Sequence, residues 1–330
     1  NKIHSAFIIE DGGQVYQNNA NVAATFNMNI NNPASWGPNG SNHANGWQFI
    51  ASPFVDAPIS DFTDVDDNYD LYKYEGESAG KEWNNQKNDD SFEDIFVNGR
   101  AYLASYESLD TASLSGNIYT STVFSKDLTY TEGRELANFH LLGNPFSFNM
   151  DMSGVTASGL VSGYAIIGAD GAYIYAPADT TIAVGDGFYV KTIAENPTFS
   201  YSLKDVEQRT RGGEDARSIN VIATGKAGKD NVIISFDGKA EGFDKLQNFN
   251  DAIATVYVSE NGKNYGIANV EANATEVELS FVAAQMGNYT ISLDVNGKFE
   301  TVVLVDRFTG VEFDFDEADR LMKEYFGKRA

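Results

Sequence analysis

The sequence predicts an all-β protein: an N-terminal β-domain built from two related halves, then an antiparallel, immunoglobulin-like β-sandwich, then a short C-terminal helix. Three observations predict this fold. Apolar and polar residues alternate with period two over much of the chain, as in strands that bury one face. The 17 Tyr and 22 Phe residues, with many Thr, Val and Gly residues, suit pleated sheets joined by tight turns. An apolar fraction of 42% is enough to fill buried cores.

The length of 330 residues favours two domains. The N-terminal β-domain is expected over residues 1–205. A linker is expected over residues 206–217, because "EQRTRGGEDAR" carries arginines around a Gly-Gly pair and has almost no apolar residues. The β-sandwich is expected over 218–315 and a helix-like tail over 316–330.

An internal repeat relates residues 46–135 to residues 136–202. The segments "GWQFIASPF" and "FHLLGNPF" each run an apolar strand into a Pro-Phe turn, and Pro145 follows Pro53 by 92 residues. The segments "NGRAYLASY" and "VGDGFYVKT" then share a glycine turn followed by an aromatic strand. Duplicated units of this kind commonly bury a shared face.

The C-terminal part contains about eight short strand-like runs, a density typical of an antiparallel sandwich. The pairs Asn261-Gly262 and Asn296-Gly297 predict two-residue type I′ hairpin turns, because both positions of that turn need positive φ. In the tail, Asp316 is a suitable N-cap, and Leu321 and Tyr325 would stack on one helix face.

The charge is strongly acidic. There are 47 Asp and Glu residues against 23 Lys and Arg residues, a formal net charge of −24. Such a surface repels phosphate backbones and anionic lipid headgroups, so neither nucleic acid nor a membrane surface is an expected partner. No apolar run is long enough to span a bilayer, so no membrane insertion of this chain is expected.

Several segments are similar to a known group of proteins. The runs "AFIIEDGGQVYQNNANVAATF", "DLYKYEGESAGKEWNN", "GDGFYVK" and "GNYTISLDV" resemble the C-terminal region of large cell-surface proteins of Bacteroidetes, described as adhesins. The resemblance implies export and an extracellular or cell-surface location, and it carries over no active-site residue. Members often continue with a further strand pair where this chain has its helix-like tail, which leaves the route of surface attachment open.

Catalytic signals are few. The three histidines, His4, His43 and His140, are scattered, and no metalloprotease, P-loop or nucleophile-elbow motif is present. His140 lies in a predicted buried strand, which favours a hydrogen-bonded core histidine over a catalytic base. We therefore expect no enzyme activity and no catalytic residue. A glycan hydrolase that uses two loop carboxylates is the least favoured alternative, and it stays open because two carboxylates from distant loops form no local sequence motif.

The acidic stretch "DFTDVDDNYDLYKYEG" has the alternating oxygen ligands of a calcium loop. Glycine is required at the sixth loop position, where this sequence has Tyr69, and a strand that follows at once would turn alternate side chains to opposite faces. The prediction is an acidic turn without a bound metal or cofactor, leading into a strand whose Tyr72 and Tyr74 face one way. A looser calcium site is the alternative, with these residues as ligands: Asp64, Asp66 and Asp67.

Exposed aromatic residues are the best binding candidates, since sugar rings stack on Trp and Tyr while amides bind the hydroxyls. Trp36 lies in a polar loop with Asn39 and Asn42, and Trp83 lies in the polar segment "KEWNNQKNDD". These four residues are the predicted ligand-binding set. The first functional hypothesis is a cell-surface adhesin or partner-binding module without catalysis, whose partner is a surface glycan or a host or bacterial surface protein. The alternative is a carbohydrate-binding module of a larger secreted protein.

Overall fold

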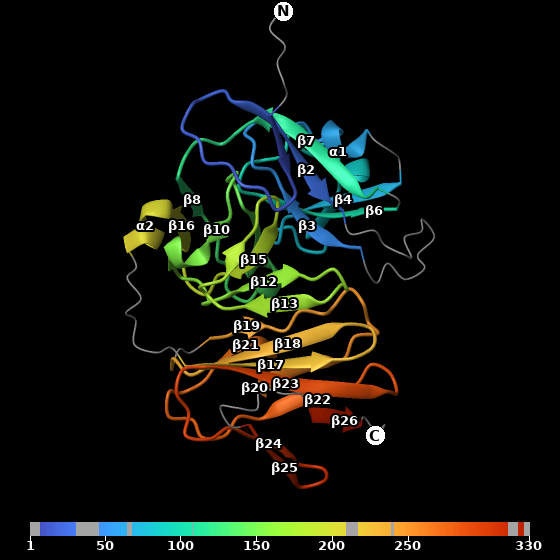
Figure 1. The fold of residues 1–330 in the computed structure, drawn as a ribbon, viewed down its shortest axis with the longest axis vertical. Helices are drawn as coiled ribbons and strands as arrows, with labels where there is room; N and C mark the ends of the chain where they lie inside the picture. Colours follow the sequence, from blue (N-terminus) through green and yellow to red (C-terminus); the bar gives the residue numbers. More distant parts are fainter. Residues whose placement is uncertain are drawn as a thin grey trace, which may run out of the picture. The chain divides into compact units, whose positions relative to one another are not determined.

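The computed structural model describes residues 7–30, 46–64, 68–107, 109–208, 217–238, 241–315 and 323–326. Over these residues the protein is all-β, which confirms the predicted fold class, and the only α-helices there are α1 (Ser60–Thr63) and α2 (Leu203–Gln208). The chain divides into two compact units (Figure 1). The first unit holds residues 1–171 and 176–210, and the second holds residues 172–175 and 211–330. The predicted linker overlaps the end of α2, and its residues 209–216 lie outside the described residues.

The first half of the first unit is a sandwich of two sheets. Its inner sheet has the strand order β3-β6-β4-β5 and its outer sheet the order β1-β2-β7. All pairings are antiparallel except the parallel pair β1–β2. The core between the sheets is rich in rings, including Phe26, Phe54 and Tyr102. The strands are β1 (Phe7–Glu10), β2 (Ala23–Asn29), β3 (Gln48–Ala51), β4 (Tyr69–Tyr74), β5 (Trp83–Asn85), β6 (Ala101–Tyr106) and β7 (Thr111–Asn117).

The second half repeats this plan. Its inner sheet contains the order β9-β15-β12 and its outer sheet the order β8-β16-β11. Phe146, Phe188 and Tyr201 lie in the core between them. The strands are β8 (Val123–Asp127), β9 (Phe139–Gly143), β11 (Val155–Ser158), β12 (Tyr164–Ile167), β15 (Gly187–Lys191), β16 (Thr198–Ser202) and the short pair β10 (Met150–Asp151) with β14 (Thr181–Ile182). The described residues of the unit also form three 3-10 turns: η1 (Gln86–Asn88), η2 (Glu135–Asn138) and η3 (Met152–Gly154).

The two halves share one strand order, but their bounds differ from the predicted repeat over 46–135 and 136–202, because β1 and β2 lie before residue 46 and β8 of the second half lies before residue 136. The inner order β3-β6-β4 matches β9-β15-β12, and the outer pair β2–β7 matches β8–β16. The two Pro-Phe turns are held by the same kind of hydrogen bond between a side chain and the backbone. Ser52 Oγ accepts a hydrogen bond from the Phe54 amide at 3.1 Å, and Asn144 Oδ1 accepts one from the Phe146 amide at 2.9 Å. In each turn the oxygen of a short polar side chain accepts a hydrogen bond from the backbone amide two residues later. This shared requirement explains why the two segments are similar in sequence.

The second unit is one curled sheet, a half-barrel, with the order β22-β20-β21-β18-β17-β23-β26 and β19 paired to β21. Its pairings are antiparallel except the parallel pair β18–β21. The hairpin β24–β25 forms a separate small sheet. The strands of this sheet and of the hairpin are β17 (Ser218–Thr224), β18 (Lys229–Ser235), β19 (Phe243–Asp244), β20 (Thr255–Glu260), β21 (Lys263–Asn269), β22 (Leu279–Val282), β23 (Asn288–Asn296), β24 (Val303–Asp306), β25 (Val311–Asp314) and β26 (Lys323–Phe326). Residues 173–175 of β13 (Tyr173–Ala176) also belong to this unit, but not to the curled sheet. An immunoglobulin-like strand order stays a prediction.

One of the two predicted type I′ hairpins of this unit is present and the other is not. Asn261 and Gly262 have φ of 52° and 80° and join β20 to β21, as expected for a type I′ hairpin. The hairpin predicted at Asn296-Gly297 is wrong: the segment after the turn does not pair back onto β23, and its strand β24 pairs with β25 instead.

Part of the predicted C-terminal helix is also corrected. Residues 323–326 form strand β26, which pairs with β23, so a helix is wrong for these four residues. The free edge of β23 offers backbone hydrogen bonds that outweigh the local helix signal there. The rest of the tail, 316–322 and 327–330, lies outside the described residues. Among the described residues, no helix is long and apolar enough to cross a membrane.

Candidate functional site

Most of the predicted ligand-binding set lies outside the described residues, namely Trp36, Asn39 and Asn42. The exception is Trp83, a half-buried residue on β5 at the edge of the inner sheet. Its ring meets the ring of Tyr74 edge to face, with centroids 4.9 Å apart, and the ring of Tyr189 at 6.4 Å. Tyr74 is fixed in turn, because its hydroxyl donates to the Leu136 carbonyl at 2.6 Å. Trp83 therefore packs in the aromatic layer between the inner sheets of the two halves.

The acidic stretch of residues 61–76 contains most of helix α1 and the whole of strand β4. The backbone amide of Asp64 caps α1 by donating to the Ser60 carbonyl, while Asp66 and Asp67 lie outside the described residues. Further on, Asp70 accepts a hydrogen bond from Asn85, and Glu75 accepts one from Asn84, each at 2.9 Å. Within the described ranges, no three His, Cys, Asp or Glu side chains are grouped to hold a metal ion. The alternation along β4 places Tyr72 and Tyr74 on one face, as predicted.

A buried charge cluster lies on the opposite face of β4. The Lys73 ammonium, whose side chain is only 4% exposed, is 2.9 Å from Asp89, 3.7 Å from Glu75 and 3.9 Å from Glu93. Burial works against this charge, but the hydrogen bond to Asp89 and the carboxylates of Glu93 and Glu75 raise the pKa of Lys73 overall. The lysine occupies the position between the three carboxylates, so the cluster is an internal ion network.

His140 is a packing residue, in keeping with its sequence context. It lies on β9, and one ring nitrogen is 2.9 Å from the Thr129 carbonyl oxygen. Burial lowers the pKa of His140, which favours the neutral ring.

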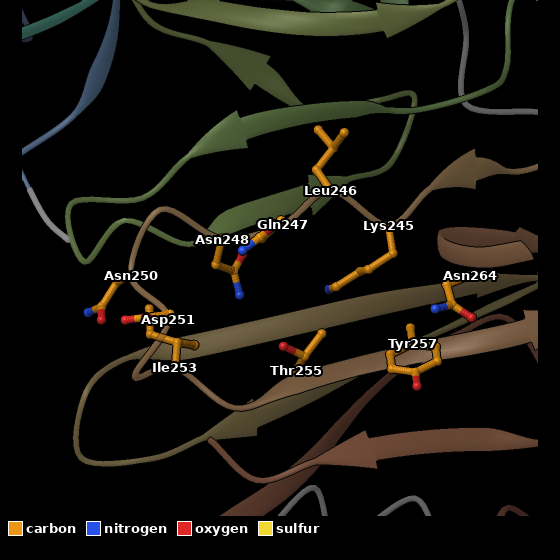
Figure 2. Close-up of a pocket in the computed structure, with 10 residues that line it drawn as sticks. All are labelled: Lys245, Leu246, Gln247, Asn248, Asn250, Asp251, Ile253, Thr255, Tyr257 and Asn264. Atoms are coloured by element: carbon orange, nitrogen blue, oxygen red, sulfur yellow. The ribbon is translucent and has the colours of Figure 1, made fainter. Parts of the chain in front are cut away.

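The second unit contains a pocket of about 280 Å³ that the sequence did not predict. It is formed by the loop between β19 and β20 and by the first residues of β20 and β21 (Figure 2). In Figure 2 the side chains of Lys245 and Asn248 point toward Thr255, whereas Leu246 points away. Most of the wall consists of amide, hydroxyl and aromatic groups. The lining residues are Lys245, Leu246, Gln247, Asn248, Asn250, Asp251, Ile253, Thr255, Tyr257 and Asn264.

The pocket loop is held at both ends by one carboxylate. Asp230 on β18 is fully buried; its Oδ1 accepts from the Lys245 ammonium at 2.7 Å and its Oδ2 accepts from the Val256 amide at 2.7 Å. Lys245 begins the loop and Val256 follows it, so Asp230 ties the two ends together. The Asn250 side chain stiffens the middle of the loop by accepting from the Ala252 amide at 3.1 Å.

The charges of Lys245 and Asp230 are sequestered by this arrangement. Burial raises the pKa of Asp230 while Lys245 pulls it back, and burial lowers the pKa of Lys245 while Asp230 opposes the change. The Lys245 ammonium also donates to the Asn231 carbonyl at 2.9 Å and lies 4.7 Å from the centre of the Tyr175 ring. The lysine thus shapes the base of the pocket rather than offering a free cation to a ligand.

Buried amides complete the base. Asn231 accepts from the Tyr175 amide through Oδ1 and donates to the Tyr175 carbonyl through Nδ2, both at 2.9 Å. Asn248 is 8% exposed, and its Oδ1 accepts from the Tyr173 amide at 2.9 Å. Its Nδ2 makes no hydrogen bond of ordinary length to the described residues, although it is close enough to Asp230 to help lower the pKa of that carboxyl. The result is a rigid polar floor beneath a more exposed wall.

The only signal that the sequence offers for this pocket is the polar run "KLQNFND" between two strand patterns. Such a run is typical of an ordinary loop. Comparisons with known proteins add nothing further: no family model, no curated protein and no solved structure matches this chain.

Proposed function

We propose that this protein is a binding protein without catalytic activity, and that it recognises a glycan through the pocket of the second unit. The observation that carries the proposal is the composition of the wall, in which amides, a hydroxyl and one tyrosine ring surround a preformed space of about 280 Å³. Small-ligand sites are concave and preformed, with a few placed polar groups that fix orientation.

The groups of the wall match the chemistry of a sugar. Asn264, Gln247 and Thr255 offer both donors and acceptors to ring hydroxyls. Tyr257, half-buried on β20, offers a ring face to the sugar C–H groups. Because Asp230 already holds both ends of the loop, less conformational freedom is lost on binding.

Binding without chemical turnover is supported by what lines the pocket. Asp251 is the only carboxylate among its lining residues in the described part of the chain. A glycoside hydrolase needs two carboxyl groups on either side of the scissile bond. Turnover is tested by incubating the chain with each bound glycan and measuring released reducing ends, and we expect none above a buffer blank.

The proposal is tested by screening the full chain on a glycan array and titrating the best ligand by calorimetry. Tyr257→Ala should weaken binding about fivefold, because a lost ring contact corresponds to about 1 kcal/mol. Phe308→Ala is the matched control, since it removes an exposed ring that does not line the pocket. A screen without ligands, or affinities that Tyr257→Ala leaves unchanged, would refute the proposal.

A second candidate function, adhesion to a surface protein, is supported by the hairpin β24–β25. Its tip residue Phe308 is 89% exposed, and its turn is ordered because Asp306 accepts from the Phe308 amide at 2.9 Å and from the Thr309 hydroxyl at 2.7 Å. A held, exposed aromatic ring is a typical anchor of protein interfaces. Display at the cell surface is part of this proposal and derives from the resemblance in sequence.

This second candidate is tested by measuring how much labelled protein is retained on intact bacterial or host cells. Phe308→Ala should reduce retention, whereas Met286→Ala, which removes another exposed apolar side chain, should not. Equal retention of the two variants and the parent chain would argue against the hairpin as the adhesive surface.

A further inference from the structure

The pocket presents a negative charge to its ligand. Of its two charged lining residues, Lys245 is committed to Asp230 at 2.7 Å and to the Asn231 carbonyl at 2.9 Å. Asp251 is exposed and has no hydrogen bond or ion pair with any residue that the structure describes. A ligand therefore meets one available carboxylate and no available cation in this wall.

The tyrosine of the wall adds to the same preference. The face of an aromatic ring attracts cations, with about 0.5–1 kcal/mol at exposed sites. Tyr257 thus offers a surface that accepts either a sugar C–H face or an ammonium group. At longer range, the net charge of −24 attracts cations and repels anions.

We infer that the pocket prefers amino sugars with a protonated amine over acetylated, neutral or acidic sugars, with Asp251 as the residue that decides the preference. This inference rests on the proposed glycan binding. The ammonium group would pair with the Asp251 carboxylate while the ring hydroxyls meet Thr255 and Asn264. Acidic sugars would be repelled by the same carboxylate and would find no free cation in the wall.

The test uses oligosaccharides that differ only in charge. The full chain is titrated with a chitosan oligomer, with the chitin oligomer of the same length and with an oligogalacturonate, at a pH where the sugar amine is protonated. We expect chitosan to bind about tenfold more tightly than chitin, as one charge-assisted hydrogen bond would give, and oligogalacturonate not to bind. High salt should reduce the preference by screening.

Two variants separate a specific contact from general attraction to an acidic protein. Asp251→Asn should remove the preference for chitosan over chitin, whereas Glu312→Gln, which removes the same charge from the hairpin β24–β25, should retain it. Equal effects of the two variants, or an unchanged preference in Asp251→Asn, would overturn the inference. Binding of both oligomers with equal affinity, sensitive to Tyr257→Ala, would overturn this inference and leave the proposed function standing. Failure of every saccharide to bind would refute both.

Discussion

Gly143 lies directly against Ala51, the residue at the same position of the other half of the first unit. A Cβ placed on Gly143 would be 2.5 Å from the Cβ of Ala51 and 2.8 Å from the Arg100 carbonyl oxygen. The hydrogen bonds around this contact are reciprocal: the Ala51 amide donates to the Gly185 carbonyl at 2.7 Å, and the Gly143 amide donates to the Gly99 carbonyl at 3.1 Å. Equivalent residues therefore meet across an approximate twofold relationship between the halves.

This contact predicts that Gly143→Ala destabilises the first unit. The added methyl group has no room, and overpacking of a filled core typically costs about 1–3 kcal/mol. Calorimetric unfolding of the purified chain measures the change. Adding Ala51→Gly to this variant should restore part of the lost stability, because it removes one of the two clashing atoms. Gly287→Ala is the control, as no described atom lies within 4 Å of a Cβ placed on Gly287, and it should change stability little. A stable Gly143→Ala variant would show that the halves are not packed this closely.

The repeat could be predicted from the sequence because the Pro-Phe turn of each half is held by the same kind of hydrogen bond. Ser52 and Asn144 are different residues, yet both accept a hydrogen bond from the amide two positions ahead, and both are followed by Pro-Phe. Local requirements of this kind select similar residues in the two halves, so the repeat can be recognised in the sequence. The contact between Ala51 and Gly143 leaves none, since it depends on how the two sheets pack.

The ion pair beneath the pocket predicts a large difference between single and double substitutions. Lys245→Met alone, or Asp230→Asn alone, leaves a buried group without its partner and should cost about 3–5 kcal/mol. The double variant should be clearly more stable than the sum of the two losses implies, because neither charge is then stranded. Denaturant unfolding of all four chains measures the coupling. Arg307→Met is the exposed control: the Arg307 side chain is 62% exposed and its guanidinium is 2.7 Å from Glu276, so its loss should not change stability measurably. Additive losses would mean that the pair is not coupled.

The pocket itself could not be predicted, and the reason is physical. Asp230 belongs to β18, whereas Lys245 and Val256 lie at the two ends of a later loop, and only the curled sheet brings the carboxylate between them. The failed hairpin at Asn296-Gly297 shows the same limit. A strong local turn signal is overruled there, because the strand that follows it, β24, pairs with β25 and not with β23.

Calcium should not stabilise the chain specifically. The carboxylates of Asp70 and Glu75 each accept a hydrogen bond from an asparagine, and Asp70 lies on β4 whereas Glu75 follows the end of that strand. A specific site at a hundredfold excess of ligand over its dissociation constant would add about 2.7 kcal/mol. We expect equal melting temperatures in calcium and in matched magnesium. A rise in calcium alone that Asp64→Ala abolishes would establish the looser site.

The carboxyl of Asp186 predicts a pH dependence of the first unit. Although part of this residue reaches solvent, surrounding protein atoms and then the charge of Asp11 raise its pKa from 3.8 to about 6. The folded state thus holds this proton more tightly than the unfolded state does. Its contribution to stability is complete below the unfolded pKa of 3.8 and is lost as the pH rises through about 6. Asp186→Asn should therefore stabilise the unit, relative to the parent chain, more at neutral pH than at pH 3.8. Melting curves across this range measure the difference, and a constant offset between the two chains would contradict the shift.

Substitutions of Trp83 distinguish a role in packing from a role in ligand binding. Its ring is 4.9 Å from Tyr74 and 6.4 Å from Tyr189, and such aromatic pairs contribute about 0.5–1.5 kcal/mol each beyond their buried area. Trp83→Ala should therefore lower the stability of the first unit by about 2 kcal/mol, and Trp83→Phe should recover part of the loss. Glycan affinity should stay unchanged in both variants, because Trp83 does not line the pocket of the second unit. Calorimetric unfolding and glycan titration on the same preparations give the two readings. A Trp83→Ala variant that unfolds like the parent chain but no longer binds the glycan would instead make this ring part of the ligand-binding surface, as its polar sequence context first indicated.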